Sequence, residues 1–187
     1  MNQFILIAGP CAIEDKEMAL RIGTEVKAIC QDLGIRYIFK GSYRKANRSR
    51  LDSFTGIGDE KALTILKELG EELGLETITD IHESHEAEMV AKYVDHIQIP
   101  AFLCRQTELL LAAAKTGKGV NIKKGQFLSP EAMKFPVEKV ESVNPGSAWV
   151  CERGVSFGYS DLIVDATAVH RLKKLNVPVI MDCTHSV

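Results

Sequence analysis

The sequence lacks a strong charge imbalance, and this absence limits the kinds of partner it can have. Its 187 residues include 23 basic and 25 acidic side chains, which gives a formal net charge of -2 at pH 7. Proteins that bind nucleic acids or membrane surfaces usually carry a clear basic excess. The composition therefore gives no general reason to expect either kind of partner, and any affinity for anions must be local.

The sequence also lacks paired cysteines and long apolar runs. Its cysteines are odd in number and widely scattered, without a Cys-x-x-Cys pair, which argues against a disulfide framework and favours a reducing compartment. No apolar run approaches the roughly 20 residues that span a bilayer, and the first eight residues lack the basic start of a signal peptide. We expect a soluble, cytoplasmic protein.

Linkers, low-complexity segments and a Gly-x-Gly-x-x-Gly fingerprint are absent too, so we expect one domain over residues 1–187, with 45% hydrophobic residues for its core. Short aliphatic runs alternate with amphipathic segments along the whole chain, which predicts parallel βα units. The expected strands are Phe4–Ala8, Arg36–Lys40, Glu76–Ile81, His96–Pro100, Gly119–Lys123, Ala148–Glu152 and Pro178–Asp182.

Apolar spacing predicts the helices between these strands. Residues 18–33 and 62–73 each carry aliphatic side chains at intervals of three and four, which marks one apolar face. A third helix is expected from about Gln106 to Lys115, with an apolar run from Leu109 to Ala114. A further helix opens at Ser129-Pro130-Glu131, and Leu162–Leu175 is expected to be the last one.

Polar residues follow nearly every expected strand, and this favours a (β/α)8 TIM barrel, in which the carboxyl ends of all strands surround one mouth. An open doubly wound sheet would show the same periodicity. A complete barrel needs eight strands and roughly 250 residues. Only seven strands are expected here. We therefore expect the sequence to be truncated after the seventh strand.

A basic loop follows the second expected strand. Between residues 40 and 50 there are five cations and no acid, interleaved with serine and asparagine. A loop held at a strand end with this composition suits phosphate binding. The alternative is an ordinary solvated basic loop. The cations are Lys40, Arg44, Lys45, Arg48 and Arg50.

Further cations follow later strands. Lys123 ends the fifth strand, Lys124 follows it and Arg153 follows the sixth, so all three could face the same mouth as Lys40 and Lys45. Together they predict a site for a small, multiply charged anion. Taken singly, each could instead form a salt bridge to Glu152 or Asp80.

Two groups of residues have metal-ligand chemistry. Cys11 follows the first strand and His185 the seventh, so a closed barrel would bring the thiol and the imidazole near each other. A simply packed thiol is the alternative for Cys11, and we expect the other four cysteines to lie in the core. The run His82–Glu86 is a rival cluster, but its acids are better explained as the first turn of a helix.

Seven segments of the sequence, in the same order, closely resemble the 3-deoxy-D-manno-octulosonate 8-phosphate (KDO8P) synthases. The resemblance covers essentially the whole chain, and it does not depend on one motif. The segments are Ile7–Glu14, Lys45–Ser49, Thr79–Ser84, Gln98–Gln106, Lys123–Phe127, Glu152–Gly154 with Phe157–Tyr159, and Thr184–Val187.

The resemblance implies a homotetrameric TIM-barrel transferase of lipopolysaccharide biosynthesis. It would condense phosphoenolpyruvate with D-arabinose 5-phosphate and water, giving KDO8P and phosphate. The resemblance also assigns roles to residues. Lys123 and Arg153 would hold phosphoenolpyruvate, Lys40 and Lys45 its carboxylate and the new bond, Asn47, Arg48 and Ser49 the sugar phosphate, and Asp80 and Gln98 the rest of the sugar or a water.

The same resemblance implies a divalent transition metal, Zn, Fe or Mn. Metal-requiring members have cysteine at the position of Cys11, whereas metal-free members have asparagine. Cys11 and His185 would be two of four ligands, with a glutamate and an aspartate expected beyond residue 187. Arg44 and Arg50 depart from the commonest pattern and add cations beside the phosphate loop.

Two alternatives remain open at this point. One is 3-deoxy-D-arabino-heptulosonate 7-phosphate synthase, which uses erythrose 4-phosphate, although that family more typically has Lys-Pro-Arg-Thr where this chain has Lys45-Ala-Asn-Arg-Ser49. The other is a non-catalytic phosphate-binding barrel fragment.

Overall fold

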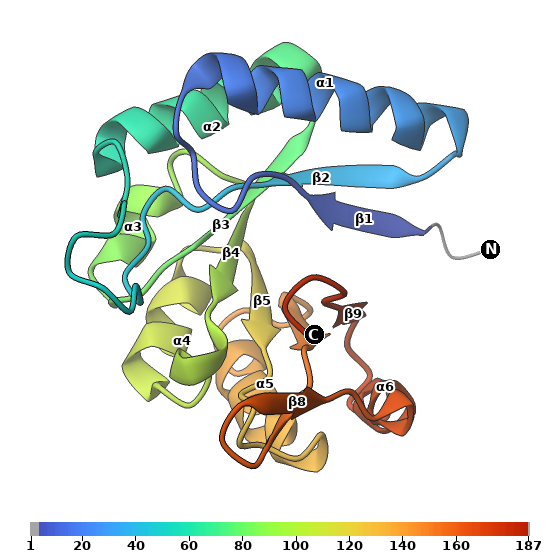
Figure 1. Cartoon of the computed structure of the whole chain (residues 1–187). Helices are drawn as coiled ribbons and strands as arrows, with labels where there is room; N and C mark the ends of the chain where they lie inside the picture. Colours follow the sequence, from blue (N-terminus) through green and yellow to red (C-terminus); the bar gives the residue numbers. More distant parts are fainter. Residues whose placement is uncertain (1–3, 187) are drawn as a thin grey trace. The chain divides into compact units, whose positions relative to one another are not determined.

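A computed structural model describes residues 4–186, which divide into two compact units (Figure 1). The first unit contains residues 4–80 and 90–96, and the second contains residues 81–89 and 97–186. Met1–Gln3 and Val187, the last residue of one family-like segment, lie outside the described residues. Each unit is described by itself.

The first unit is built from parallel strands connected by helices. Strand β1 pairs with β2, and β2 pairs with β3, so chain order and sheet order agree. The interior of this unit is aliphatic and aromatic, with Ile38, Phe39 and Ile78 fully buried. Its elements are β1 (Ile5–Ala8), α1 (Lys16–Asp32), β2 (Arg36–Lys40), α2 (Asp59–Leu73) and β3 (Glu76–Asp80).

The predicted apolar face is confirmed for α2 and partly wrong for α1. In α2 the expected residues Ala62, Leu66 and Leu69 are fully buried. In α1 the buried positions are Ala19, Gly23 and Cys30, whereas Ile29 and Leu33 of the predicted face are exposed. The helix packs through small residues: a Cβ on Gly23 would lie 2.8 Å from a Leu73 methyl carbon. The helix therefore packs closely through its small residues, and two large side chains of the predicted face, Ile29 and Leu33, stay exposed.

The second unit repeats the same strand–helix alternation. Strand β5 pairs in parallel with β6, and β6 with β9. Helix α4 buries two leucines and two alanines, as its apolar sequence predicts. The elements that follow β3 are α3 (Glu86–Val90), β4 (His96–Ile99), η1 (Ala101–Leu103), α4 (Thr107–Lys115), β5 (Gly119–Lys123), η2 (Glu131–Met133), α5 (Lys134–Glu141), β6 (Ala148–Glu152), α6 (Ala166–Lys173) and β9 (Val179–Met181).

A hairpin between β6 and α6 corrects the last helix prediction. The first residues of the expected helix Leu162–Leu175 form strand β8 (Asp161–Ile163), which pairs antiparallel with β7 (Val155–Phe157). Gly158 has φ 64 in the connecting turn, a conformation that favours glycine. The helix begins only after Asp165, whose side chain caps α6 by accepting a hydrogen bond from the Thr167 backbone N–H at 2.8 Å.

The predicted fold class is confirmed. All seven expected strands exist within a residue or two of their predicted ends, and in chain order a helix follows each of the first six. This is the repeating unit of a (β/α)8 barrel. Within residues 4–186 no helix is both long enough and apolar enough to cross a bilayer. The expectation of a single domain stays a prediction.

Candidate functional site

In the first unit, the ends of β1 and β2 are packed against each other without room for a side chain. A Cβ on Gly9 would lie 2.0 Å from the Lys40 carbonyl oxygen, and Gly9 has φ 156. The pairing then continues through a parallel bridge between Ala12 and Ser42. This close approach places the exposed Cys11 thiol on the chain segment that runs beside the start of the basic loop.

The basic loop contains cations in two different situations. Lys45 is held by the scaffold, because its Nζ donates to Ser42 Oγ at 2.9 Å and its backbone N–H donates to the Thr55 carbonyl at 2.8 Å. Arg44 instead lies 3.6 Å from Asp59, and Arg50 makes two hydrogen bonds to Asp52. The two arginines that depart from the family pattern therefore have carboxylate partners nearby in the chain.

The tip of this loop is open to solvent. Asn47, Arg48 and Ser49 are all exposed, as expected for residues that meet a ligand from outside. The Arg48 Nε donates to the Phe54 carbonyl at 3.1 Å, so the guanidinium is anchored by a neutral acceptor. Lys40 is half-buried at the end of β2, and Asp80 is buried at the end of β3.

In the second unit, Lys123 at the end of β5 is joined to Asp182, which directly follows β9. The Lys123 Nζ lies 2.5 Å from Asp182 Oδ2, and both side chains are 12% exposed. Burial of Asp182 opposes ionisation, but the Lys123 hydrogen bond, the His185 backbone N–H and the nearby cations outweigh it. The pKa of Asp182 therefore lies well below its usual range.

The Asp182 carboxylate also contacts His185, the expected metal ligand. His185 Nδ1 lies 3.1 Å from Oδ1 and 3.0 Å from Oδ2, and Arg153 Nη2 donates to the His185 carbonyl oxygen. Three predicted site residues of this unit, Lys123, Arg153 and His185, thus belong to one hydrogen-bonded group. Asp182, which joins Lys123 to His185, was expected only as the last residue of the seventh strand, with no role in the site.

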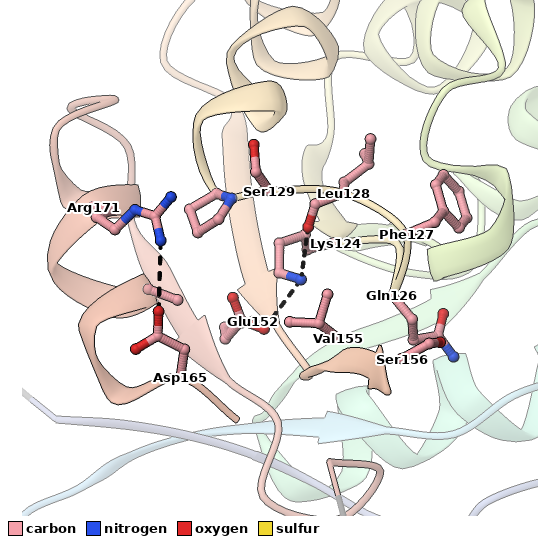
Figure 2. Close-up of a pocket in the computed structure, with 12 residues that line it drawn as sticks. Lys124, Gln126, Phe127, Leu128, Ser129, Glu152, Val155, Ser156, Asp165 and Arg171 are labelled. Carbon is pink, nitrogen blue, oxygen red and sulfur yellow. Dashed lines mark hydrogen bonds and ion pairs between the residues drawn. The ribbon is translucent and has the colours of Figure 1, made fainter. Parts of the chain in front are cut away.

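Of the two interpretations of Lys124, the structure supports the salt bridge to Glu152. Its side chain is fully buried, with Nζ 3.3 Å from Glu152 Oε1 and hydrogen bonds to the carbonyls of Leu128 and Gly154. Figure 2 shows this ion pair in the wall of a cavity of about 430 Å³. Lys124 is therefore a structural cation. The cavity is lined by residues such as Phe127, Val155 and Arg171, and Lys124 is the one lining residue that was expected among the site cations.

Gln98 is buried in the second unit, where its Oε1 accepts a hydrogen bond from Asn121 Nδ2 at 3.2 Å. This hydrogen bond joins a residue of β4 to a residue of β5 and fixes the orientation of the Gln98 side-chain amide.

The rival metal cluster at residues 82–86 has the structural role that its position suggested. Glu86 is buried at the start of α3, and its Oε2 accepts hydrogen bonds from the backbone N–H groups of His82 at 2.7 Å and Glu83 at 3.3 Å. Across residues 4–186, no group of three or more His, Cys, Asp or Glu side chains is arranged to hold a metal ion.

The cysteine predictions are mostly confirmed. Cys30, Cys104 and Cys151 are buried as expected, and burial raises the pKa of Cys151 to about 12. Cys183 is exposed, so its placement in the core was wrong. It follows the short strand β9, where the chain has already left the sheet.

The predicted site residues fall in both units. Those near the ends of β1 to β3 belong to the first unit, and those that lie in or after β4, β5, β6 and β9 belong to the second. Convergence of the two sets on one substrate stays a prediction. The first set is Cys11, Lys40, Lys45, Asn47, Arg48, Ser49 and Asp80, and the second is Gln98, Lys123, Arg153 and His185.

Comparison with known proteins decides the family. The model of the DAHP synthetase I family matches residues 1–187. A 2-dehydro-3-deoxyphosphooctonate aldolase of Fusobacterium nucleatum is 50% identical over 186 residues, which is 100% of this chain and 67% of that protein. The chain belongs to the DAHP synthetase I family. 2-Dehydro-3-deoxyphosphooctonate aldolase is another name for KDO8P synthase, a condensing transferase, so the resemblance seen in the sequence is confirmed.

Other members agree. A 2-dehydro-3-deoxyphosphooctonate aldolase of Cyanothece is 49% identical over 98% of this chain and 67% of its own length, and one of Cupriavidus taiwanensis is 50% identical over 98% and 66%. The chain thus spans about two thirds of the length of these relatives. None of these names favours the alternative that uses erythrose 4-phosphate.

Proposed function

We propose that this chain carries the condensing activity of KDO8P synthase, in which phosphoenolpyruvate, D-arabinose 5-phosphate and water give KDO8P and phosphate. One observation carries the proposal. Relatives at about half identity over nearly the whole chain share this enzyme name, and the residues that the family resemblance assigns to substrates occupy strand ends and the adjoining loop in this structure.

The cations divide between the two substrates. Lys123 and Arg153 bind phosphoenolpyruvate, and Lys40 and Lys45 meet its carboxylate and the forming bond. The support is that Lys123, Arg153 and Lys45 are each held by a hydrogen bond within their own unit before any ligand arrives. The sugar phosphate is bound by the exposed loop tip Asn47, Arg48 and Ser49, and Asp80 and Gln98 contact the rest of the sugar or a water.

The reaction moves charge rather than requiring a covalent enzyme intermediate. The double bond of phosphoenolpyruvate attacks the sugar aldehyde and forms the new carbon–carbon bond, water adds to the carbon that bears the phosphate, and the tetrahedral product expels phosphate. Cations such as Lys45 that are already fixed in place stabilise this shifting charge without reorganisation. When both substrates are bound, their reacting groups are already oriented, so phosphoenolpyruvate, the sugar and water do not have to meet in one collision.

Cys11 and His185 also fit a divalent transition metal by their chemistry. Both side chains are exposed, and thiolate and imidazole are preferred ligands of Zn and Fe. A bound metal would act as a Lewis acid or lower the pKa of a water. The family resemblance implies two further carboxylate ligands, and no described residue is assigned to those places.

Three further properties are proposed from the family. The chain acts in the cytoplasm, in lipopolysaccharide biosynthesis, which agrees with its five free cysteines. It assembles as a homotetramer, and exposed apolar side chains such as Ile29, Leu33 and Phe135 are of the kind that subunit interfaces cover. Light scattering of the purified protein tests the assembly.

Phosphate release tests the activity directly. The protein is incubated with phosphoenolpyruvate and either D-arabinose 5-phosphate or erythrose 4-phosphate, before and after treatment with a chelator. Release with arabinose 5-phosphate alone, lost on chelation and restored by Zn²⁺ or Mn²⁺, supports the proposal. Turnover with erythrose 4-phosphate alone contradicts it, and binding of both substrates without release indicates a non-catalytic phosphate-binding protein.

A further inference from the structure

Asp182 accepts hydrogen bonds from two candidate site residues, Lys123 and His185, and from backbone N–H groups that directly follow it in the chain. Its Oδ2 lies 2.5 Å from Lys123 Nζ, and both carboxylate oxygens lie within 3.1 Å of His185 Nδ1. Oδ1 also accepts the backbone N–H groups of Thr184 at 3.1 Å and His185 at 3.0 Å. Among the described residues, each of these hydrogen-bond partners of the carboxylate is thus a nitrogen that can donate.

The sheet positions this carboxylate. Asp182 directly follows β9, and its backbone N–H donates to the Glu152 carbonyl at 2.9 Å, which extends the pairing of β9 with β6. Lys123 ends β5 on the other side of β6, in register with Cys151. The two positions are therefore two strands apart and also offset along the sheet, so their backbones are more than about 9.5 Å apart, a gap that a long side chain such as lysine can bridge.

The contacts also determine which nitrogen of the His185 ring carries hydrogen. A carboxylate that is paired with an ammonium group has only acceptor oxygens, so the facing Nδ1 must donate. In the neutral ring the other nitrogen, Nε2, then carries no hydrogen and presents its lone pair away from Asp182. Arg153 holds the backbone of the same residue by donating to the His185 carbonyl oxygen.

We propose that Asp182 is a positioning residue that holds Lys123 in place and fixes His185 in the Nδ1–H tautomer, with Nε2 as the atom offered to a metal ion. The part that concerns the metal rests on the proposed function. The part that concerns the tautomer rests only on contacts within the second unit. Carboxylates that accept a hydrogen bond from the distal nitrogen of a metal-binding histidine orient the ring and raise its affinity.

The test compares Asp182→Asn with Asp161→Asn, an exposed aspartate of β8 in the same unit. The asparagine keeps the size of the side chain, and its Oδ1 can still accept the two backbone N–H groups. Its amide nitrogen, however, replaces Oδ2 and directs N–H groups at Lys123 and at His185 Nδ1. We therefore expect the variant to lose the Nδ1–H preference and to shift towards Nε2–H.

The tautomer is read from ¹⁵N chemical shifts of histidine-labelled protein about two pH units above the ordinary imidazole pKa. Comparison with His185→Gln assigns the resonance, and circular dichroism confirms that each variant is folded. A wild-type ring with its hydrogen on Nδ1 that changes in Asp182→Asn and not in Asp161→Asn supports the proposal. Hydrogen on Nε2 in the wild type, or an unchanged tautomer in folded Asp182→Asn, overturns it.

Zinc titration of the same samples separates this inference from the proposed function. Zinc affinity, read from the His185 resonance, should fall by about 10- to 100-fold in Asp182→Asn and stay unchanged in Asp161→Asn. Unchanged affinity in both variants overturns the metal part of the proposal. If zinc does not move the wild-type resonance, the metal role of His185 fails, whereas a changed tautomer still supports the positioning role of Asp182.

Discussion

Lys124 and Glu152 form an ion pair from which water is excluded: Nζ lies 3.3 Å from Oε1, and the two side chains are 0% and 1% exposed. Glu152 Oε1 also accepts the backbone N–H groups of Arg153 at 2.9 Å and Gly154 at 2.7 Å. The pair therefore ties the end of β5 to the chain that leaves β6. Its neighbours on the sequence, Lys123 and Arg153, are two of the predicted substrate cations, so its structural role bears on the site.

Replacing Lys124 by methionine should strongly destabilise the fold. The change leaves the Glu152 carboxylate buried without its cation, and removal of one partner of a buried pair costs about 3–5 kcal/mol in free energy of unfolding. Lys134→Met is the matched control, since Lys134 and Glu138 form an exposed pair at 3.5 Å. That change should cost at most about 1 kcal/mol. Urea unfolding measures both, and similar losses would contradict the structural role of Lys124.

Replacing Gly9 by alanine should separate the ends of β1 and β2. The added Cβ would lie 2.0 Å from the Lys40 carbonyl oxygen, so the backbone must move as well as adopt an unfavourable φ. We expect a loss of about 2–3 kcal/mol in free energy of unfolding. Gly34→Ala is the control, because Gly34 has φ 64 and nothing within 4 Å of its added Cβ. It should lose only about 1 kcal/mol, and a loss equal to that of Gly9→Ala would refute the close approach.

The sequence predicted those features that depend on local pattern. Each strand was a short aliphatic run with turn residues on both sides, and helices such as α2 had a repeating apolar face, so neither needed knowledge of distant contacts. The residues that carry the family resemblance were also readable directly. The roles assigned to Lys123 and His185 came from these motifs and not from the geometry of the two side chains.

Features that depend on distant partners could not be predicted in this way. Adjacent lysines 123 and 124 look alike in sequence, and only Glu152 and the carbonyl of Gly154 decide that the second is enclosed. The end of β8, Leu162 and Ile163, was read as the start of a helix because its apolar residues fit both periods, and its partner β7 was not predicted. Asp182 received no role because its importance comes from contacts with side chains that different strands supply.

The thiols should divide into two reactivity classes. Cys11 and Cys183 are exposed, whereas Cys30, Cys104 and Cys151 are buried, and burial raises the pKa of all three buried thiols. Because the thiolate is the reactive form, a thiol reagent should modify the exposed pair rapidly and the other three only after denaturation. Intact mass after timed alkylation counts the modified residues. Slow modification of Cys183 in the folded protein would mean that the end of β9 is covered.

Arg48→Ala should separate the two substrates of the proposed reaction. The Arg48 side chain is exposed at the loop tip, and its Nε is anchored to the Phe54 carbonyl, so the guanidinium is held ready for a phosphate. Loss of one such charged contact should raise the KM for arabinose 5-phosphate by about 10- to 100-fold. The KM for phosphoenolpyruvate should change little.

Arg50→Ala is the matched control for that variant. Arg50 lies two residues further along the same loop and is 78% exposed, but its guanidinium is bound to the Asp52 carboxylate at 2.8 Å. Because that charge is already neutralised, its removal should leave both KM values close to those of the unmodified protein. Steady-state phosphate release with each substrate varied in turn measures the effect. Equal increases for the two substrates in Arg48→Ala, or a similar increase in Arg50→Ala, would show that the loop acts through its general positive charge and does not select the sugar phosphate.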